Sequence, residues 1–424
     1  MKFKLAHLAN CLVAATILSS FLFFPERSYA QADDENSVTN LCHPTLTAND
    51  VVATWQHRNR AGGKAKPPKI VGPTGFDWSD SQLGVVRSRE AGEYLFFGSD
   101  GSCHGNCGTR FERDGSIVRT VGLLNNPLGN GPPFETILPQ SFQFKDNRVV
   151  YVGGGPVNRV PPGRPGAGNL LLVYTAARWT NLVQRNGMYD FTGLAKSTDD
   201  GLTWIDLGFI ITANRRFKPG ASPTYNEYDG GLGNLVPDPA GQYFYFYFPD
   251  KVTKGGVDGS SYTFFSAARV PMDELLHAAF DHEAPAPLPS FEKYYEDRWD
   301  QPGLGGLSTS LLNPQSLAGD PSVVWSDFLQ RYVVIFDDTH TLSYAESVDG
   351  IHWAPATPLL KASAIASVLY AVPVGLGDDT NAIGRQFYVF YTYYPNPTQS
   401  GGGWQNATIK RLDMQCENDA VHAR

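Results

Sequence analysis

The chain has 424 residues, of which 43 are glycine and 30 are proline, and 12% are aromatic but only 18% are charged. Its formal net charge of −8 excludes the strongly basic surface that nucleic acids and anionic membranes attract. Glycine and proline at this density are typical of many short strands joined by turns, which indicates an all-β fold.

The first thirty residues have the pattern of a secretory signal peptide. Lys2 and Lys4 precede an apolar stretch from Leu8 to Phe24, and Ser28-Tyr29-Ala30 offers small residues at a cleavage site. An uncleaved N-terminal anchor is the alternative. No later segment reaches the roughly 20 apolar residues that a spanning helix needs. We therefore expect residues 1–30 to be a signal peptide and residues 31–424 to form a single secreted or periplasmic domain without a membrane span.

Four cysteines follow the predicted cleavage site, and an even number in an oxidising compartment predicts two disulfides. Cys103 and Cys107 flank a short loop that contains glycine and could pair locally, which leaves Cys42 with Cys416 near the two ends of the mature chain. That second bridge would join the first and last segments of a ring. A metal site of Cys103, His104 and Cys107 is the alternative, although no second ligand pair with finger-like spacing exists.

Short runs rich in aromatic and β-branched residues recur along the chain, with turn residues between them. One segment, Met272 to Phe280, has a helical pattern instead, and we expect it to lie on a connection. The clearest strand candidates are 94–98, 149–152, 170–176, 243–248, 262–267, 332–336 and 387–391.

A degenerate repeat organises these strands. Five stretches share the order of an acidic or polar approach, a turn, an aromatic strand and a second strand ending in a glycine turn. Their spacing of roughly 50 to 90 residues fits four-stranded blades. The repeat predicts a five-bladed β-propeller, with six blades as the alternative. The stretches begin near Asp77, Glu135, Glu227, Asp320 and Leu369.

Two local motifs support this repeat. Ser197 to Trp204 follows the Ser-x-Asp-x-Gly-x-Thr-Trp pattern of an Asp-box, and Ser347 to Trp353 is a shorter relative of it. In such a hairpin the aspartate binds turn backbone, the glycine adopts a positive φ, and the tryptophan packs back across the strands. We expect both motifs in the outer hairpins of blades and assign no catalytic role to Asp199 or Asp349.

The motifs carry a resemblance to known families. Asp-box hairpins in a secreted propeller resemble those of sialidases and other propeller glycosidases. The shorter motif, together with Gly319-Asp320-Pro321-Ser322-Val323 and the following Tyr332-Val333-Val334, looks more like the five-bladed furanosidases, which comprise the arabinanase and xylosidase group and the invertase and levansucrase group. This resemblance implies a secreted glycoside hydrolase that acts on a polysaccharide or oligosaccharide, with pentofuranose (arabinan-like) sugars as the expected substrate.

The resemblance also implies three carboxylates around the propeller axis. One acid protonates the leaving oxygen, a second activates water or attacks the anomeric carbon, and a third holds the sugar and tunes the acid. The candidates are Asp77 as base or nucleophile, Glu227 as acid and Asp320 as the third carboxylate. Asp229 lies two residues after Glu227, on the same face of an extended segment, so either could be the acid. With Glu227 chosen as the acid, we expect Asp229 to bind the substrate.

The sequence departs from these families at two places. Glu135 stands where the arabinanase group would supply an aspartate, and the opening motif of the invertase group is absent.

Several further residues are candidates for substrate binding. Trp78 adjoins Asp77, and Arg178-Trp179 offers a cation and a stacking platform after a predicted strand. His104 could bind a sugar hydroxyl or a metal ion. We expect no cofactor or catalytic metal, although a structural calcium ion at the axis is a feature of related propellers, and the sequence does not define the oligomeric state.

Two other functions remain open. One is a non-catalytic carbohydrate-binding propeller, in which the carboxylates only accept hydrogen bonds from hydroxyl groups. The other is a sialidase, which needs a tyrosine nucleophile and three arginines around a substrate carboxylate. Arg87, Arg110 and Arg178 are available for that role. The glycine-rich segment 302–308 lacks a lysine and a following helix, so we expect a tight loop close to the axis there and no nucleotide site.

Overall fold

The computed structural model describes parts of the chain between residues 42 and 417, so the predicted signal peptide lies outside the described residues. The described residues are 42–44, 50–54, 81–90, 92–99, 115–127, 129, 134–138, 149–181, 186–214, 217, 233–250, 264–282, 286–312, 319–395 and 408–417.

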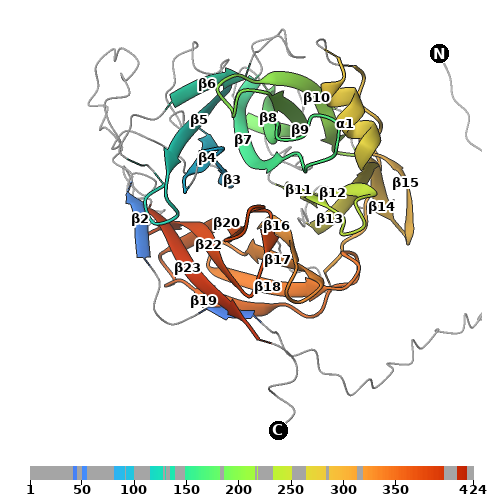
Figure 1. Cartoon of the computed structure of the whole chain (residues 1–424). Coiled ribbons are helices and arrows are strands. Elements are labelled where there is room, and N and C mark those ends of the chain that lie inside the picture. The colour runs from blue at the N-terminus through green and yellow to red at the C-terminus, as the bar shows by residue number, and fades with distance from the viewer. Residues whose placement is uncertain are drawn as a thin grey trace, which may run out of the picture. The chain divides into compact units, whose positions relative to one another are not determined.

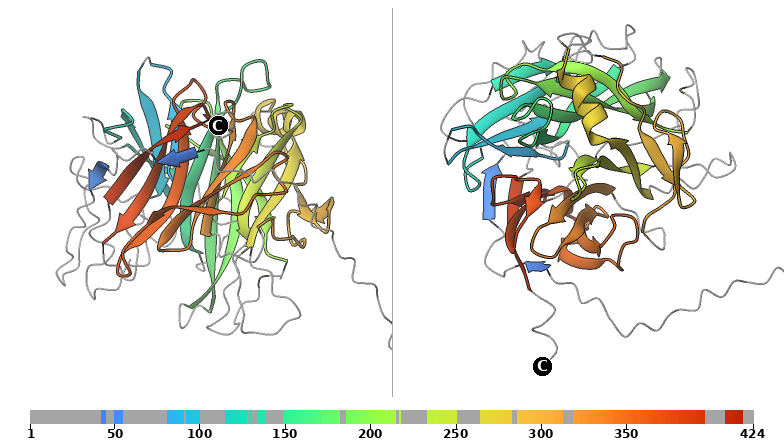
Figure 2. Two further views of the ribbon diagram at one scale, coloured as in Figure 1. Left: turned by 90° about the horizontal axis from the view of Figure 1, so that it is seen from below. Right: turned by 45° about the vertical axis from the view of Figure 1, so that its right-hand side comes forward.

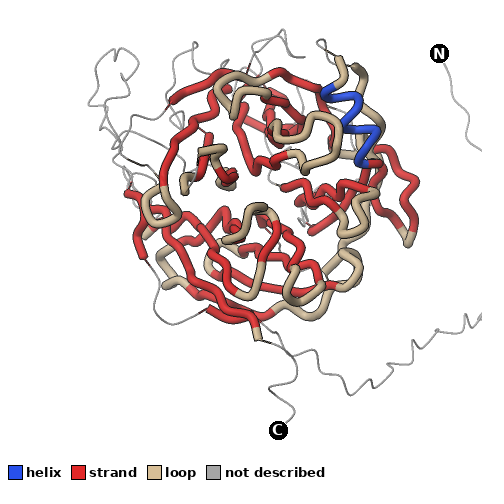
Figure 3. Tube along the Cα trace, viewed as in Figure 1, coloured by secondary structure: helices blue, strands red, loops and turns tan. Residues whose placement is uncertain are grey.

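Five sheets stand in a ring around a central axis (Figure 1), and strands make up almost all of the regular structure (Figure 3). Within the sheets, most strands that follow one another in the chain pair side by side, and these pairs are antiparallel. The prediction of an all-β, five-bladed propeller is therefore confirmed, and the alternative of six blades is wrong.

The first two blades have four strands each. The first blade is built from β3 (Gly84–Arg87), β4 (Tyr94–Ser99), β5 (Gly115–Gly122) and β6 (Phe134–Leu138). The second blade is built from β7 (Val149–Arg159), β8 (Leu170–Asn181), β9 (Asn186–Ser197) and β10 (Ile205–Thr212).

The third and fourth blades each carry a fifth strand. The third is built from β11 (Asn234–Pro237), β12 (Tyr243–Asp250), β13 (Phe264–Pro271), β14 (Glu292–Tyr295) and β15 (Arg298–Pro302). The fourth is built from β16 (Gly319–Ser326), β17 (Arg331–Asp337), β18 (Thr341–Ser347), β19 (Thr357–Lys361) and β21 (Ala382–Ile383).

The fifth blade joins the two ends of the described chain. Its strands are β20 (Ser367–Gly375), β22 (Gln386–Tyr394), β23 (Thr408–Cys416) and, outside them, β1 (Cys42–Pro44) and β2 (Asp50–Thr54). Figure 2 shows β1 and β2 in blue beside the red strands of this blade. β1 and β2 both pair with β23, and the Cys42–Cys416 disulfide links two residues that are partners in the ladder. The predicted bridge between Cys42 and Cys416 is therefore confirmed, whereas Cys103 and Cys107 lie outside the described residues.

The core lies between the blades. Five clusters of buried apolar side chains are present among the described residues, and each cluster joins two neighbouring blades. Each sheet therefore buries both of its faces against the sheets beside it, which is the reason that its strands are rich in apolar residues on both sides.

The predicted helix is also confirmed. α1 (Met272–Phe280) follows β13 directly and buries Leu275, Leu276 and Ala279 against the second and third blades. The ammonium group of Lys196, on β9, donates to the backbone carbonyls of Ala279 and His282 at the C-terminal end of α1. A cation at this end complements the helix dipole. In the part of the chain that the structure describes, no helix is long and apolar enough to cross a membrane.

The two predicted turn motifs lie between the third and fourth strands of their blades. In the first, Asp199 accepts hydrogen bonds from the Thr203 amide (2.9 Å) and hydroxyl (2.6 Å), and Gly201 has φ 82°. Trp204 packs edge-on against Phe97 of the first blade, with 5.7 Å between ring centroids. The turn therefore fastens the second blade to the first.

Replacing Asp199 with alanine is expected to lower the free energy of unfolding by about 1–2 kcal/mol, because the Thr203 amide loses its partner. Urea titration measures this loss, with the exposed neighbour Thr198→Ala as the matched control. Equal stability of the two variants would contradict this role for Asp199.

Two expectations about the chain path are wrong. Glu135 lies on β6, the outermost strand of the first blade, where it pairs with Val118, and the second blade opens later, with β7. The segment 302–308 lies at the outer edge of the third blade, where the Thr212 amide of β10 donates to Gly303 O (3.1 Å), and not near the axis. Both predictions were wrong for the same reason. Turn residues show where a strand ends, but they do not show how far that strand lies from the propeller axis.

Candidate functional site at one mouth of the propeller

The innermost strands of the five blades, β3, β7, β11, β16 and β20, surround the axis (Figure 1). They run in the same sense, because contacts between them join matching ends. At one end, Gln82, two residues before β3, donates to Asp320 O at the start of β16 (2.8 Å). Asn234 at the start of β11 exchanges two hydrogen bonds with Val323 in the middle of β16, at 2.6 and 2.9 Å. At the other end, Arg159 of β7 donates to the carbonyl of Arg87 at the end of β3 (2.8 Å). We call the end where these strands begin the upstream mouth and the opposite end the downstream mouth.

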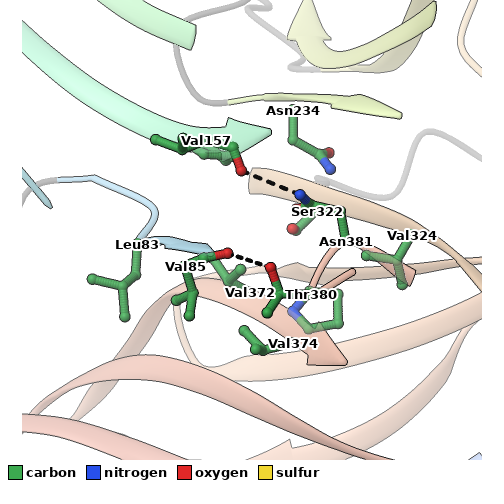
Figure 4. Close-up of a pocket in the computed structure, with 12 residues that line it drawn as sticks. Leu83, Val85, Val157, Asn234, Ser322, Val324, Val372, Val374, Thr380 and Asn381 are labelled. Carbon is green, nitrogen blue, oxygen red and sulfur yellow. Dashed lines mark hydrogen bonds between the residues drawn. The ribbon is translucent and has the colours of Figure 1, made fainter. Parts of the chain in front are cut away.

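A small pocket lies between the innermost strands. Twelve residues from these strands and their flanks line it (Figure 4). Its volume of about 10 Å³ accommodates about one water molecule, so no sugar ring fits inside this pocket.

The loop after β20 covers the downstream end of the axis. The Thr380 hydroxyl donates to Val85 O (2.6 Å), and the Asn381 amide donates to Val157 O (3.2 Å). At the upstream end, the side-chain amide of buried Gln82 reaches from the first blade to the fourth. It donates to Asp320 O (2.8 Å) and Pro321 O (3.1 Å). Gln82 therefore forms a floor below the upstream mouth.

Three innermost strands carry a β-bulge at their upstream ends. The register shifts fall between Val149 and Tyr151 in β7, between Gly319 and Ser322 in β16, and between Leu369 and Val372 in β20. A bulge changes the direction of a strand and re-aims a side chain, and bulges are frequent beside active sites. The bulge of β16 contains Asp320, and that of β20 contains Tyr370.

Asp337 is a buried carboxyl group beside these bulges. It ends β17, is the ladder partner of Gly319 and is 2% exposed. Burial raises the pKa of this carboxyl to about 7, against an ordinary value of 3.8, and the nearby charge of Asp338 adds to the rise, while hydrogen bonds from the Thr339 and Tyr370 amides oppose it. Its Oδ2 atom has no hydrogen-bond partner among the described residues. Asp337 therefore exchanges a proton near neutral pH, as carboxyl groups at functional sites often do.

The backbone around Asp337 is strained. Asp320 has φ 45°, Thr339 has φ 79° and Tyr370 has φ 60°, although none of them is glycine. Such conformations cost on the order of 1–3 kcal/mol each and gather at functional sites. Thr339 donates its amide to Asp337 Oδ1 (3.2 Å), and Tyr370 donates its own to the same carboxyl group. Through these two hydrogen bonds, Asp337 links the fourth blade to the fifth blade at the upstream mouth.

Of the residues predicted from sequence, Asp320 lies at this mouth and is partly exposed. Arg178 and Trp179 lie on β8 opposite Tyr189 and Met188 of β9, at the end of β8 that pairs with the start of β7. The other predicted residues lie outside the described part of the chain: Asp77, Trp78, His104, Glu227 and Asp229.

Sequence analysis missed Asp337, Gln82 and Tyr370. One signal was available for Asp337, because an acidic pair, Asp337-Asp338, directly follows the apolar run from Tyr332 to Phe336. No motif marked Gln82 or Tyr370, whose roles depend on contacts between distant blades.

No family model matches the sequence, and no curated protein matches it. Solved structures similar to the chain include a GH43_1 enzyme from Xanthomonas citri (14% identity, 78% of this chain and 86% of that chain, TM-score 0.43). A family 117 glycoside hydrolase from the marine bacterium Zobellia galactanivorans is 12% identical over 80% of this chain and 88% of its own, with a TM-score of 0.47. The α-L-arabinofuranosidase of Podospora anserina, in complex with cellotriose, is 9% identical over 89% and 95%, with a TM-score of 0.44. The likeness concerns the fold and does not decide what this chain does.

Within the described ranges, no group of three or more histidine, cysteine, aspartate or glutamate side chains is arranged to hold a metal ion. The alternative metal site at Cys103, His104 and Cys107 lies outside those ranges.

Proposed function

We propose that the protein is a glycoside hydrolase whose active site occupies the upstream mouth. One observation carries this proposal. Asp320, a partly exposed carboxyl group, lies at the bulged start of an innermost strand. Beside it lies the buried carboxyl group of Asp337, the residue paired in the ladder with Gly319, whose pKa burial raises to about 7.

Glycoside hydrolysis requires carboxyl groups in two protonation states, one that donates a proton and one that is ionised. We assign Asp320 to the mouth as the carboxylate that holds the sugar. Since Asp337 is almost fully buried, we assign it a positioning role, in which it fixes the strained residues Thr339 and Tyr370 around Asp320.

Asp77 remains our candidate for the base or nucleophile, and Glu227 for the acid, with Asp229 as its alternative. The support is their place in the sequence. Asp77 precedes Gly84 of β3 by the same number of residues as Glu227 precedes Asn234 of β11, and both strands begin at the upstream mouth. Trp78, His104, Arg178 and Trp179 remain candidates for binding the substrate.

The proposed substrate is a polysaccharide or oligosaccharide that contains pentofuranose units, as the resemblance of the motifs to furanosidases implies. We place the protein outside the cytoplasm, either secreted or in the periplasm, because the Cys42–Cys416 disulfide suits an oxidising compartment. We also assign the Ser197–Trp204 and Ser347–Trp353 turns as Asp-boxes with a structural role.

A non-catalytic carbohydrate-binding propeller is the second candidate, and the burial of Asp337 favours it, since a buried carboxyl group cannot touch a substrate. A sialidase is disfavoured. The Arg87 guanidinium donates to Leu376 O (3.2 Å) and Gly377 O (2.9 Å) in the loop that covers the downstream end. Arg87 is therefore not available for an arginine cluster at the upstream mouth.

Release of reducing sugar from arabinan, xylan and fructan tests the proposal. We expect Asp320→Asn to lower the rate about 100-fold through lost contacts to the sugar, and Asp77→Asn and Glu227→Gln to abolish it. The matched control is Asp273→Asn, a surface carboxylate on α1 that pairs with Arg164. If the wild type binds a glycan but does not hydrolyse it, the protein is a carbohydrate-binding propeller and not a hydrolase. Full activity of Asp77→Asn and Glu227→Gln would refute the catalytic roles assigned to Asp77 and Glu227.

A further inference from the structure

The second strand of the third blade alternates tyrosine with phenylalanine. In β12, Phe244, Phe246 and Phe248 are buried in the cluster between the second and third blades. Tyr243, Tyr245 and Tyr247 alternate with them, and the last two belong to the cluster between the third and fourth blades. One face of the strand is therefore purely apolar, while the other carries three phenol groups.

The partly buried aromatic rings at this second seam include Tyr243 and Tyr245 of β12, Trp299 of β15 and Trp325 of β16. We call these four rings the aromatic seam patch. Buried Tyr332 supports the patch from below, with ring centroids 5.0 Å from Trp325 and 6.3 Å from Tyr245. Trp299 lies 5.5 Å from Tyr245, so the rings form one continuous set.

The patch is remote from the upstream mouth. Tyr243 is the first residue of β12, directly after the turn that ends β11, and Trp325 is the next-to-last residue of β16. Both positions lie toward the downstream ends of the innermost strands, whereas Asp320 lies at the upstream end of β16. A ligand at the patch and a ligand at the mouth would therefore occupy different faces.

A polar group accompanies these rings. The Arg269 guanidinium lies 4.5 Å from the ring centroid of Tyr243 and 4.8 Å from that of Trp299, and its side chain is 23% exposed. Its Nε atom is buried without a hydrogen-bond partner among the described residues. Glu292 lies 3.5 Å from this nitrogen and balances the charge of the guanidinium. Asp238, which accepts a hydrogen bond from the Tyr243 amide (2.9 Å), adds a second negative charge nearby. The patch thus combines aromatic faces with hydrogen-bond donors and no excess of positive charge.

The phenol of Tyr245 remains a hydrogen-bond donor at all ordinary pH values, because burial raises its pKa above the usual value of 10. Tyrosine and tryptophan rings with one apolar face and one polar edge suit a ligand that is itself apolar on the faces of its rings and hydroxylated at their edges. A neutral sugar has this character. An acidic or sulfated glycan would need an excess of positive charge, which Glu292 removes here, and an anionic membrane would be repelled by the net charge of −8.

We propose that the aromatic seam patch is a second carbohydrate site, which binds a strand of neutral polysaccharide apart from the upstream mouth. The site does not depend on catalysis, so the proposal holds or fails separately from the proposed hydrolase. Bound there, a polymer would keep the protein on its substrate while the mouth acts on another segment, which raises the effective concentration of that segment.

Electrophoresis in native gels that contain arabinan, arabinoxylan, levan or β-glucan tests this site through the retardation of the protein. We expect at least one of these neutral polysaccharides to retard the wild type. Loss of one ring costs about 1 kcal/mol of stacking, so Trp299→Ala and Tyr243→Ala should each weaken the affinity about fivefold. The double variant should lose most of the retardation, whether or not the mouth also binds the polymer, and Trp299→Phe should keep part of it.

Two controls make the result specific. Val348→Ala removes an apolar side chain that is 68% exposed elsewhere on the surface and should change nothing. Asp320→Asn, at the mouth, should keep the retardation that the patch variants lose. Unchanged retardation of the double variant would overturn the proposal. Loss of retardation in Asp320→Asn alone would locate all binding at the mouth and overturn it as well, and so would a wild type that no polysaccharide in the panel retards.

Discussion

Replacing both Cys42 and Cys416 with serine is expected to lower the free energy of unfolding by about 2–5 kcal/mol. The two cysteines are 374 residues apart in the chain, so the bridge closes almost the whole propeller into one loop. A cross-link over so long a loop removes much of the conformational entropy of the unfolded chain, which is the main reason that it stabilises the folded state.

The disulfide also closes the ring, so its loss should weaken the fifth blade locally as well as lowering the stability of the whole protein. β1 contributes only three residues to its ladder with β23, and strands this short hold weakly without further support. Without the bridge, we expect β1 to detach from the fifth blade before the other blades unfold. Hydrogen exchange would show this as lost protection in β1 and in the facing part of β23.

Guanidinium denaturation of the double serine variant measures the stability change. The comparison should be made in a background with Cys103→Ser and Cys107→Ser, so that no other pair contributes. In that background, a reductant should move the midpoint of the protein with Cys42 and Cys416 onto that of the double serine variant. Equal midpoints without reductant would show that the bridge contributes nothing to stability.

Asp337→Asn is expected to stabilise the protein above pH 8 by on the order of 3 kcal/mol and to leave its stability below pH 4 almost unchanged. Burial raises the pKa of this carboxyl from 3.8 to about 7 in the folded state. Between these values the folded protein binds more protons than the unfolded chain, so the stability of the wild type falls as the pH rises from about 4 to about 7. An asparagine cannot ionise, and its amide oxygen still accepts the hydrogen bond from Thr339.

Urea titrations at pH 4, 6 and 8 measure the difference between the two proteins. Asp338→Asn is the matched control, because Asp338 is the exposed neighbour of Asp337 and acts on it only through its charge. That control should retain most of the fall in stability with pH. An unchanged slope in Asp337→Asn, or a slope removed equally by Asp338→Asn, would contradict a buried, proton-exchanging carboxyl group at position 337.

The same variant separates positioning from a simple structural role, provided that the mouth is an active site. If Asp337 positions Asp320 and Tyr370 through its charge state, Asp337→Asn should shift the pH profile of kcat/KM while the protein stays folded. A change in stability with an unaltered pH profile would leave Asp337 as a structural group between the fourth and fifth blades.

Local chemistry in the sequence was sufficient for much of the fold. The Ser197–Trp204 and Ser347–Trp353 turns were predictable because their hydrogen bonds and positive φ values involve residues only a few positions apart. The helix at Met272–Phe280 and the strands were predictable for the same reason, since propensity and periodicity are local properties. The blade count was predicted from a repeated local order of strands and turns, although the repeat assigned near Glu135 began on an outer strand of the first blade.

The sequence by itself determined that this protein is built from short strands and marked turns, with cysteines near both ends that can close a ring. Only the tertiary structure decided which side chains meet. Glu135 lies on an outer strand of the first blade. Gln82 of the first blade donates hydrogen bonds to the fourth blade, and Asp337 is a buried carboxyl group that accepts one from Tyr370 of the next blade. The physical reason is that burial and strain at the mouth come from contacts between blades that are distant in the chain, and no local pattern encodes which sheet lies beside which residue.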